Sequence, residues 1–296
     1  MNNFLEKLSK RLGGRLFKET MTALYNYLIH PNIHSRFLAE YYITWFLKGY
    51  RAKDQVLYKY YFKDNHFEID DIKLPTLKDE DMGVFCHDFF DIILSQWIKT
   101  KSLHFTFHDG PYENNNVKIE EGDIVFDAGA NIGLFSVLAL KKGAKRVYAF
   151  EPVPKSLEYL NKTKLLNDFD NRLEIVPHAL SDEEGISYIK FKEDNIAISS
   201  LILDILEGKE FKVKTITIDK FVEENKIERV DFIKADIEGA ERLMLMGAKN
   251  VLKEFKPKLA ICSYHLPDDK EVLTKIILEA NPKYELEFTS SKIFAK

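Results

Sequence analysis

The amino-acid sequence predicts an α/β protein with a doubly wound, mostly parallel sheet and a helical N-terminal accessory region. From Glu121 onward, short apolar runs alternate with helical segments, and strands that alternate with helices pair in parallel. A glycine-bearing loop stands where the first of these strands meets the first helix, which is where doubly wound sheets bind ligands. The first hundred residues lack this alternation.

The accessory region is expected to cover residues 1–100. Between residues 2 and 30, apolar positions recur at helical spacing while lysine and arginine fill the other faces, which predicts an amphipathic helix. Such a helix can lie on an anionic membrane surface. A Gly-Gly pair interrupts this one, and packing against a core or a partner is the favoured interpretation. Residues 37–61 and 88–98 also have helical patterns, with a polar connection containing Pro75 between them.

The regular part of the chain is expected to span residues 108–296. It begins with an apolar strand, the glycine loop and a helix, followed by the strand RVYAFEP, a helix at 155–167 and the strand LEIVPHAL. Two extra strands, at 186–192 and 211–218, and a short helix capped by Asp219 come next. The order then resumes with VDFIKAD and a helix from Ala240, LAICSYH and a helix at 268–280, and a hairpin of YELEFTS and KIFAK.

The composition indicates an ordinary globular protein, with 45% hydrophobic and 30% charged residues. The net charge is -4, and the chain has no basic stripe of the kind that neutralises nucleic-acid phosphates, so a nucleic-acid substrate is disfavoured. The two cysteines form neither a disulfide framework nor a zinc-ligand pattern. No apolar run reaches the ~20 residues that span a bilayer. We therefore expect a cytoplasmic protein.

The glycine loop reads DAGANIG at positions 127–133. Glycines there let the backbone approach a ligand closely, because no Cβ intervenes. The second strand ends in Phe150-Glu151-Pro152, which places a carboxylate 24 residues after Asp127. A carboxylate at this point can accept hydrogen bonds from both hydroxyls of a ribose. The pattern predicts a site for a cofactor that contains adenosine.

The loop itself distinguishes between two such cofactors. A dinucleotide loop has the pattern G-x-G-x-x-G for the pyrophosphate, whereas this loop reads G-x-N-x-G with Asp127 two residues before the first glycine. An acidic loop suits the positively charged amino group and sulfonium of S-adenosylmethionine better than a pyrophosphate. S-adenosylmethionine is the favoured cofactor, and an NAD-dependent oxidoreductase is the alternative. Taken singly, each of these residues also has a structural explanation as a cap or a turn.

Four segments of the chain resemble the FkbM-type S-adenosylmethionine-dependent methyltransferases. They are GDIVFDAGANIGLFS, VYAFEPVP, PHALSD and IKADIEGAE, and the resemblance covers about residues 108–296. Ala128 is a mild departure, because the family more commonly has valine there. The resemblance implies a Rossmann-like class I methyltransferase fold with seven strands, the seventh antiparallel, and methylation of a hydroxyl oxygen.

The resemblance also implies the residues of the cofactor site. It places Asp127, Gly129, Ala130, Asn131 and Gly133 around the methionine portion, Glu151 and Pro152 at the ribose, and His178 or Ala179 beside the adenine. Tyr112 and Glu113 precede the first strand. In similar proteins these two positions close over the cofactor, although a surface turn explains them equally well.

The catalytic candidates follow the fourth and fifth strands of the regular alternation: Asp236, Glu238 and His265. Methyl transfer is an in-line displacement at a carbon that the sulfonium already activates, so the protein mainly aligns the nucleophile and removes its proton. Asp236 is expected to orient the methionine amino group or a substrate hydroxyl, and His265 is a candidate base. A structural histidine before a helix start is the competing interpretation. The same three side chains could hold Mg²⁺ against a substrate diol, a weaker alternative because their spacing is poor in oxygen ligands.

The acceptor is expected to be a small molecule. After the fourth strand the chain has DIEG at 236–239, in place of the Asn/Asp-Pro-Pro-aromatic segment of enzymes that methylate a flipped base. A sugar, a glycan or another polyhydroxylated molecule is therefore favoured. An insertion at 184–229 and the N-terminal helices are expected to shape its pocket. A protein that binds the cofactor without catalysis is the remaining alternative.

Overall fold

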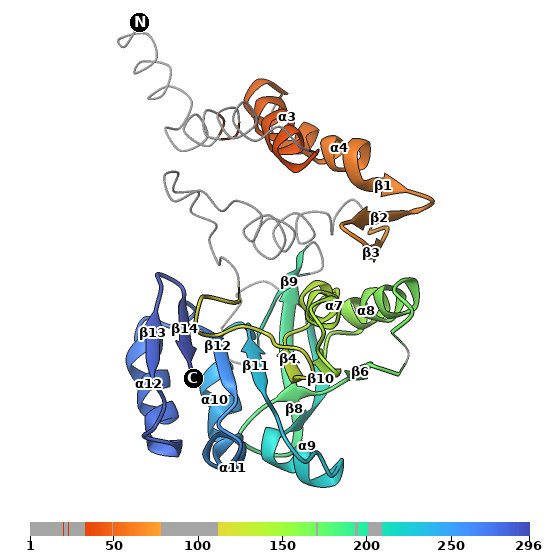
Figure 1. Ribbon diagram of the computed structural model, residues 1–296. Helices are drawn as coiled ribbons and strands as arrows, with labels where there is room; N and C mark the ends of the chain where they lie inside the picture. The colour runs from red at the N-terminus through yellow and green to blue at the C-terminus, as the bar shows by residue number, and fades with distance from the viewer. Residues whose placement is uncertain are drawn as a thin grey trace, which may run out of the picture.

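The computed structural model describes residues 20, 23, 33–48, 50–77, 112–169, 171–192, 195–200 and 209–296 (Figure 1). The predicted helix at 88–98 lies outside these residues, as does the predicted helix at 2–30 apart from Thr20 and Ala23, which are helical and buried. Within the described part of the chain, no helix is long and apolar enough to cross a membrane.

Two helices that pack on each other begin the described accessory region. They are α3 (Ile33–Lys48) and α4 (Tyr50–Tyr61), and they confirm the helices predicted at 37–61. The centroid of the Phe37 ring lies 4.9 Å from that of Tyr61, in an edge-on arrangement, and 5.4 Å from that of Tyr41. Tilted and edge-on arrangements are the ones aromatic pairs prefer, so the aromatic residues of this stretch hold the helix pair together.

A three-stranded antiparallel sheet occupies the place of the predicted polar connection. It consists of β1 (Phe62–Lys63), β2 (His66–Ile69) and β3 (Ile72–Pro75). The residues of its two turns, Asp64-Asn65 and Asp70-Asp71, all have positive φ values between 47° and 68°. Paired positive φ values belong to two-residue hairpin turns, which favour Asn and Asp. These Asx pairs are the sequence signal for the two hairpins.

The main sheet has seven strands in the order β13-β14-β12-β11-β4-β5-β6. Neighbouring strands pair in parallel except at β14, which is antiparallel to both β12 and β13. The strands are β13 (Leu286–Phe288), β14 (Lys292–Ala295), β12 (Lys258–Cys262), β11 (Phe232–Ala235), β4 (Ile124–Ala128), β5 (Arg146–Phe150) and β6 (Leu173–Val176). This order confirms the predicted sheet, its single antiparallel strand and the final hairpin.

Helices cover both faces of the main sheet (Figure 1). Val125 and Phe126 are adjacent in β4 but pack in different hydrophobic clusters, because successive strand residues point to opposite faces. The Val125 cluster includes residues of α7 and α8, and the Phe126 cluster includes residues of α9 to α12. These helices are α7 (Leu134–Lys141), α8 (Pro154–Leu166), α9 (Ile218–Glu224), α10 (Glu241–Met246), α11 (Lys249–Glu254) and α12 (Asp269–Ala280). The doubly wound fold is confirmed.

The accessory region packs on the α7–α8 side of the sheet. Phe37, Leu57 and Leu74 belong to the same hydrophobic cluster as Val125. The side-chain amide of Asn167, which follows α8, donates to the backbone carbonyl of Lys73 at 2.6 Å and accepts from its N–H at 2.9 Å. This pair of hydrogen bonds joins β3 to the end of α8.

A second sheet, in the order β7-β10-β8-β9, occupies most of the predicted insertion. Its strands are β7 (Ala179–Leu180), β8 (Gly185–Lys192), β9 (Asn195–Ser200) and β10 (Lys209–Ile216). β8 and β10 confirm the two extra strands, and β9 is an additional one. The prediction of LEIVPHAL as one strand is wrong: β6 ends at Val176, and Ala179 pairs in parallel with Thr215 in the second sheet. Pro177 between them has no N–H to continue the ladder.

Asp219 does not cap the helix in which it lies, so that prediction is also wrong. α9 begins after Thr217, whose hydroxyl accepts a hydrogen bond from the Lys220 N–H at 3.0 Å. The Asp219 carboxylate instead accepts from the backbone N–H groups of Asn250 and Val251, both at 2.9 Å, in the first turn of α11. A carboxylate is favourable at either helix N-terminus, and the packing of α11 against α9 determines which one it binds.

Candidate functional site

The carboxyl ends of β5, β4, β11 and β12 meet at one edge of the main sheet. Ala128 at the end of β4 pairs with Phe150 of β5 on one side and with Ala235 of β11 on the other. The glycine loop, Glu151 and Asp236 therefore follow three neighbouring strands, although up to 109 residues separate them in the sequence. Ligands bind at this edge in doubly wound sheets, which makes it the candidate functional site.

The glycine loop adopts a backbone conformation that requires its residue types. Gly129, Asn131 and Gly133 have φ values of 74°, 50° and 89°, in the region that glycine and asparagine tolerate best. A Cβ on Gly129 would lie 2.0 Å from the carbonyl oxygen of Asp236. The last carbonyl of β5 accepts hydrogen bonds from the N–H groups of Gly129 and Ala130, at 3.0 and 3.1 Å. The loop is thus held between the ends of β5 and β11.

Asp127 lies beneath this loop with no exposed surface. Its carboxylate accepts a hydrogen bond from the Ser136 hydroxyl at 2.6 Å and forms an ion pair with Lys234 at 3.0 Å. Burial by itself would lower the pKa of Lys234, but the charges of Asp127 and Asp236 raise it above the ordinary value. The side chain of Asp127 therefore supports the loop and is paired with Lys234. Its predicted place beside the methionine portion of the cofactor stays a prediction.

Glu151 joins the glycine loop to the segment after β5. Its carboxylate accepts hydrogen bonds from the N–H groups of Asn131 at 2.8 Å and Val153 at 2.9 Å, one on each oxygen. Burial raises the pKa of Glu151 to about 7, and the two N–H groups and Lys234 act in the opposite direction. In the ionised form each carboxylate oxygen can accept a further hydrogen bond, so the ionised group can receive two ribose hydroxyls. Pro152 is partly buried beside it.

His178 and Ala179 lie where β6 passes into the second sheet. Ala179 is buried in β7, and the His178 side chain is partly buried, with a pKa that burial lowers. The Nδ1 atom of His178 is buried and has no hydrogen-bond partner within the described structure. A neutral imidazole with an unused polar atom is compatible with a contact to an adenine.

Tyr112 contacts the site directly. Its hydroxyl donates to Oδ2 of Asp236 at 2.5 Å. Two ammonium groups lie over its ring, with Nζ of Lys292 4.5 Å and Nζ of Lys234 5.2 Å from the ring centroid. Burial, the strongest cause, and the charge of Asp236 both raise the pKa of Tyr112, so the phenol stays a hydrogen-bond donor. Tyr112 is therefore a buried part of this edge of the sheet.

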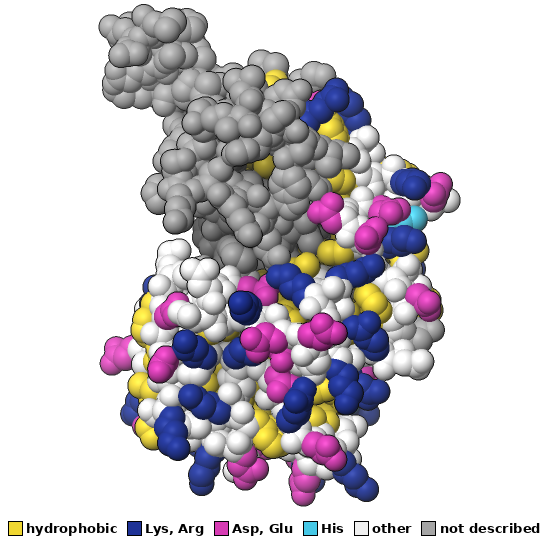
Figure 2. Space-filling model, viewed as in Figure 1, with side chains coloured by type: hydrophobic (Ala, Val, Ile, Leu, Met, Phe, Trp, Pro, Cys, Tyr) yellow, Lys and Arg dark blue, Asp and Glu magenta, His cyan; other side chains and the backbone are white. Residues whose placement is uncertain are grey.

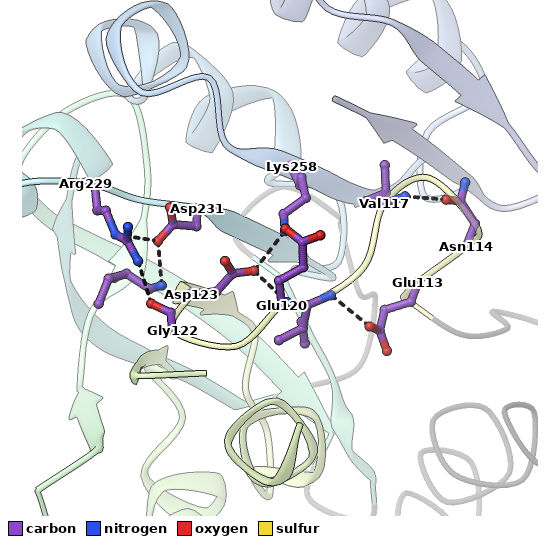
Figure 3. A network of polar contacts seen from close by, with 11 residues as sticks. Glu113, Asn114, Val117, Glu120, Gly122, Asp123, Arg229, Asp231 and Lys258 are labelled. Atoms are coloured by element: carbon purple, nitrogen blue, oxygen red, sulfur yellow. Dashed lines mark hydrogen bonds and ion pairs between the residues drawn. The ribbon is translucent and has the colours of Figure 1, made fainter. Parts of the chain in front are cut away.

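Glu113 stabilises the segment that leads from Tyr112 to β4 (Figure 3). Its carboxylate accepts a hydrogen bond from the Ile119 N–H at 2.9 Å and pairs with Lys142 at the end of α7. Farther along the segment, Lys258 forms an ion pair with Asp123 at 2.9 Å. The side chain of Glu113, 9% exposed, is thus engaged within its own turn and with α7, and closure of this segment over a cofactor stays a prediction.

His265 lies among three carboxylates. Its Nε2 atom is 3.5 Å from Oδ1 of Asp236 and 3.5 Å from Oε2 of Glu238, and its Nδ1 atom is 3.2 Å from Oε1 of Glu241. The Nδ1 contact is an ion pair whose angle falls short of a hydrogen bond. Burial by itself would lower the pKa of His265, but Glu241, Asp236 and Glu238 raise it to about 9. The three predicted catalytic residues do come together.

The four side chains of this cluster differ in how far they reach the surface. The side chains of Asp236 and Glu238 are 20% and 26% exposed, whereas those of His265 and Glu241 are 3% and 0% exposed. A ligand at the rim would therefore meet the two exposed carboxylates first. His265 and Glu241 lie behind them.

Sequence reasoning missed two residues of the site, Lys234 and Glu241. Lys234 is the single charged residue inside the apolar strand FIKA, and a charge in a buried strand requires a partner. Glu241 stands in the first turn of α10, where an acidic residue is normally explained by the helix dipole. Its complete burial and its contact with His265 are tertiary features.

Comparisons with known proteins give a consistent family. The model of the methyltransferase FkbM domain matches residues 127–286, which is more than half of the chain. The hexuronic acid methyltransferase AglP of Haloferax volcanii is 30% identical over 169 residues, or 56% of this chain and 66% of that protein. The 31-O-demethyl-FK506 methyltransferase FkbM of Streptomyces tacrolimicus is 26% identical over 174 residues, or 49% of this chain and 66% of that protein. The chain thus spans just under two thirds of each relative.

Among solved structures, methyltransferase FkbM from Methylobacillus flagellatus KT aligns with a TM-score of 0.47 and 18% sequence identity, covering 99% of this chain and 58% of that one. The family match begins at Asp127, includes the glycine loop and Glu151, and continues through the carboxylate cluster to His265 and α12. On that match, this chain belongs to the FkbM-type methyltransferase family.

Proposed function

We propose that the protein transfers a methyl group from S-adenosylmethionine to a hydroxyl oxygen of a sugar or another polyhydroxylated small molecule. The observation that carries the proposal is the juxtaposition of two half-sites at the edge of the main sheet. One is the glycine loop with Glu151, and the other is the carboxylate cluster around His265. Family membership supports methyl transfer as the reaction.

The cofactor half-site suits an adenosine with a positively charged tail. Glu151 keeps one acceptor position on each oxygen for the ribose hydroxyls, and its two backbone hydrogen bonds fix its orientation. Gly129 has no side chain, so the loop backbone lies close to Asp236 and its groups can contact a ligand directly at the edge of the sheet. Asp127 is paired with Lys234. The negative charge that faces the cationic tail of the cofactor therefore comes from Asp236 and Glu238.

The acceptor half-site supplies a place for the departing proton. In the proposed step the hydroxyl oxygen forms a bond to the methyl carbon, and the C–S bond breaks with its electron pair moving to sulfur. The hydroxyl proton passes to a carboxylate. Asp236 and Glu238 are the exposed carboxylates of the cluster, so we assign proton transfer to one of them. Tyr112 orients Asp236 through its 2.5 Å hydrogen bond.

Charge and the names of the relatives support this substrate class. Among the described residues on the face in view, Figure 2 shows acidic and basic side chains interspersed, and the net charge is -4, which suits a small acceptor better than a nucleic acid. The names of both curated relatives describe methylation of small molecules, a hexuronic acid in one and an FK506 precursor in the other. We assign the second sheet, formed by β7 to β10, to the wall of the acceptor pocket.

Calorimetric titration with S-adenosylmethionine tests the cofactor half, with NADH as the alternative ligand. We expect S-adenosylmethionine to bind and Glu151→Gln to weaken it, because an amide accepts fewer hydrogen bonds from a ribose. Conversion to S-adenosylhomocysteine in the presence of hexuronic acids and other sugars tests the acceptor half. Asp236→Asn or Glu238→Gln should slow turnover, while Glu223→Gln, on the exposed side of α9, should not. Binding of NADH alone would overturn the proposal.

A further inference from the structure

Buried polar atoms without hydrogen-bond partners are concentrated around His265. The described part of the structure contains nine such side-chain atoms, and four belong to three residues: Oδ1 of Asp236, Oε2 of Glu241, and both ring nitrogens of His265. A buried polar atom left unpaired costs about 1–3 kcal/mol. Three of the four, Oδ1 of Asp236 and the two nitrogens of His265, lie within 3.5 Å of an opposite charge in the cluster but form no hydrogen bond with it, so these atoms are available to a common ligand.

The three residues have the spacing of metal ligands. One ligand atom from each of Asp236, Glu241 and His265 lies within 4.8 Å of the other two. Ligand atoms on either side of a transition-metal ion are separated by roughly 4 Å, given bond lengths of about 2.0–2.3 Å. Small side-chain adjustments would therefore bring all three atoms onto one ion.

The second oxygen of each carboxylate is held by the protein. Oδ2 of Asp236 accepts the Tyr112 hydroxyl at 2.5 Å, and Oε1 of Glu241 accepts the Ile237 N–H at 2.8 Å. In each case one oxygen is oriented by a hydrogen bond and the other accepts none. Metal-binding carboxylates are commonly arranged in this way, with outer hydrogen bonds that fix the ligand.

We propose that Asp236, Glu241 and His265 bind a divalent transition-metal ion such as Mn²⁺ or Zn²⁺. The imidazole favours this class over Mg²⁺ and Ca²⁺, which prefer oxygen ligands. The His265 side chain is only 3% exposed and both of its nitrogens face carboxylates, so the ligand set is built into the fold and is not a surface cluster of acids.

Three protein ligands leave positions open for other ligands. The open side is where Asp236 and Glu238 reach the surface. An ion there would accept a pair of adjacent oxygens, such as a vicinal diol or a hydroxy acid. This last step rests on the proposed function, because it assumes that the acceptor enters at this rim, whereas metal binding itself does not.

The test uses the full chain without an affinity tag, treated with a chelator and then dialysed. Mn²⁺ is titrated and followed by electron paramagnetic resonance, and Zn²⁺ by calorimetry. We expect one ion per chain, with affinity reduced about 100-fold or more in Glu241→Gln, which replaces an anionic ligand by a neutral amide, and in His265→Gln, which removes the imidazole. His66→Ala is the matched control, because His66 also lies beside a carboxylate, 3.6 Å from Glu68, but in the accessory sheet.

Circular dichroism shows whether each variant is folded, and Asp236→Asn replaces any variant that is not. No binding by the wild type, or equal binding by the wild type and the folded variants, would overturn the proposal. S-adenosylmethionine binding is measured separately on the metal-free protein. That measurement can fail or succeed independently, so a failure of the metal site is distinguishable from a failure of the proposed function.

Discussion

Replacing Lys234 tests whether the glycine loop depends on a buried ion pair. The Lys234 ammonium lies 3.0 Å from Oδ1 of Asp127 and donates to the carbonyls of Ala128 and Gly129 at 3.1 and 2.6 Å. Lys234→Met removes all three interactions and leaves a buried carboxylate with the Ser136 hydroxyl as its remaining hydrogen-bond donor. Breaking a buried pair by removing one partner typically costs about 3–5 kcal/mol.

Thermal unfolding measures this loss, which corresponds to a decrease in Tm of roughly 6–20 °C for a protein of this size. Lys162→Met is the control: its ion pair with Glu158 is exposed on α8, and such pairs are worth about 0.5 kcal/mol or less. Adding Asp127→Asn to Lys234→Met should recover part of the loss, because it removes the uncompensated charge. A Lys234→Met protein with the Tm of the wild type, or a double variant no more stable than the single one, would refute the reasoning.

Three further changes test other parts of the fold. Gly129→Ala should abolish cofactor binding in calorimetry, because its Cβ would lie 2.0 Å from the carbonyl oxygen of Asp236. Gly122→Ala is the control, since Gly122 also has a positive φ but its Cβ would meet no atom closer than 3.9 Å. Similar effects of the two substitutions would contradict the predicted clash. Burial raises the pKa of Glu151 to about 7, above the unfolded value near 4.5, so the folded protein keeps a proton that the unfolded chain releases. The free energy of unfolding therefore decreases by about 3 kcal/mol as the pH rises from the unfolded to the folded pKa. The Tm of Glu151→Gln should decrease less than that of the wild type over this pH range. Parallel curves of Tm against pH for the two proteins would contradict this prediction. Thr217→Ala should reduce the free energy of unfolding by about 1 kcal/mol through loss of the α9 cap, and an unchanged value in urea unfolding would show that the cap contributes nothing.

Much of the sheet could be predicted because its signals are local. Val125 and Phe126 lie in a continuous apolar run, and strands buried on both faces read this way. The predicted positions of β4, β5, β11 and β12 place Asp127, Glu151 and the DIEG segment at strand ends, and parallel pairing then requires that those ends meet. The conformations of Gly129 and Gly133 follow from the same local pattern.

Local signals were weaker where the chain changes sheets. Pro177 lies inside LEIVPHAL, which reads as one strand, and only the pairing of Ala179 with Thr215 shows that the second sheet begins there. The turns at Asp64-Asn65 and Asp70-Asp71 carry a readable hairpin signal, but the three strands that they connect are two to four residues long. Short strands of this kind give little periodicity to detect.

Local order along the chain thus established the doubly wound fold, the glycine loop and the strand ends that carry Glu151, Asp236 and His265. The partners of these residues were decided by tertiary structure: Lys234 beneath the loop, Tyr112 on Asp236, and Glu241 behind His265. The physical reason is that periodicity specifies which face a side chain occupies, since that depends on a few neighbouring residues. The charged group or hydrogen-bond donor that a side chain contacts depends on how strands distant in sequence are brought together. In this protein those tertiary contacts determine the charge and the hydrogen bonding of the site.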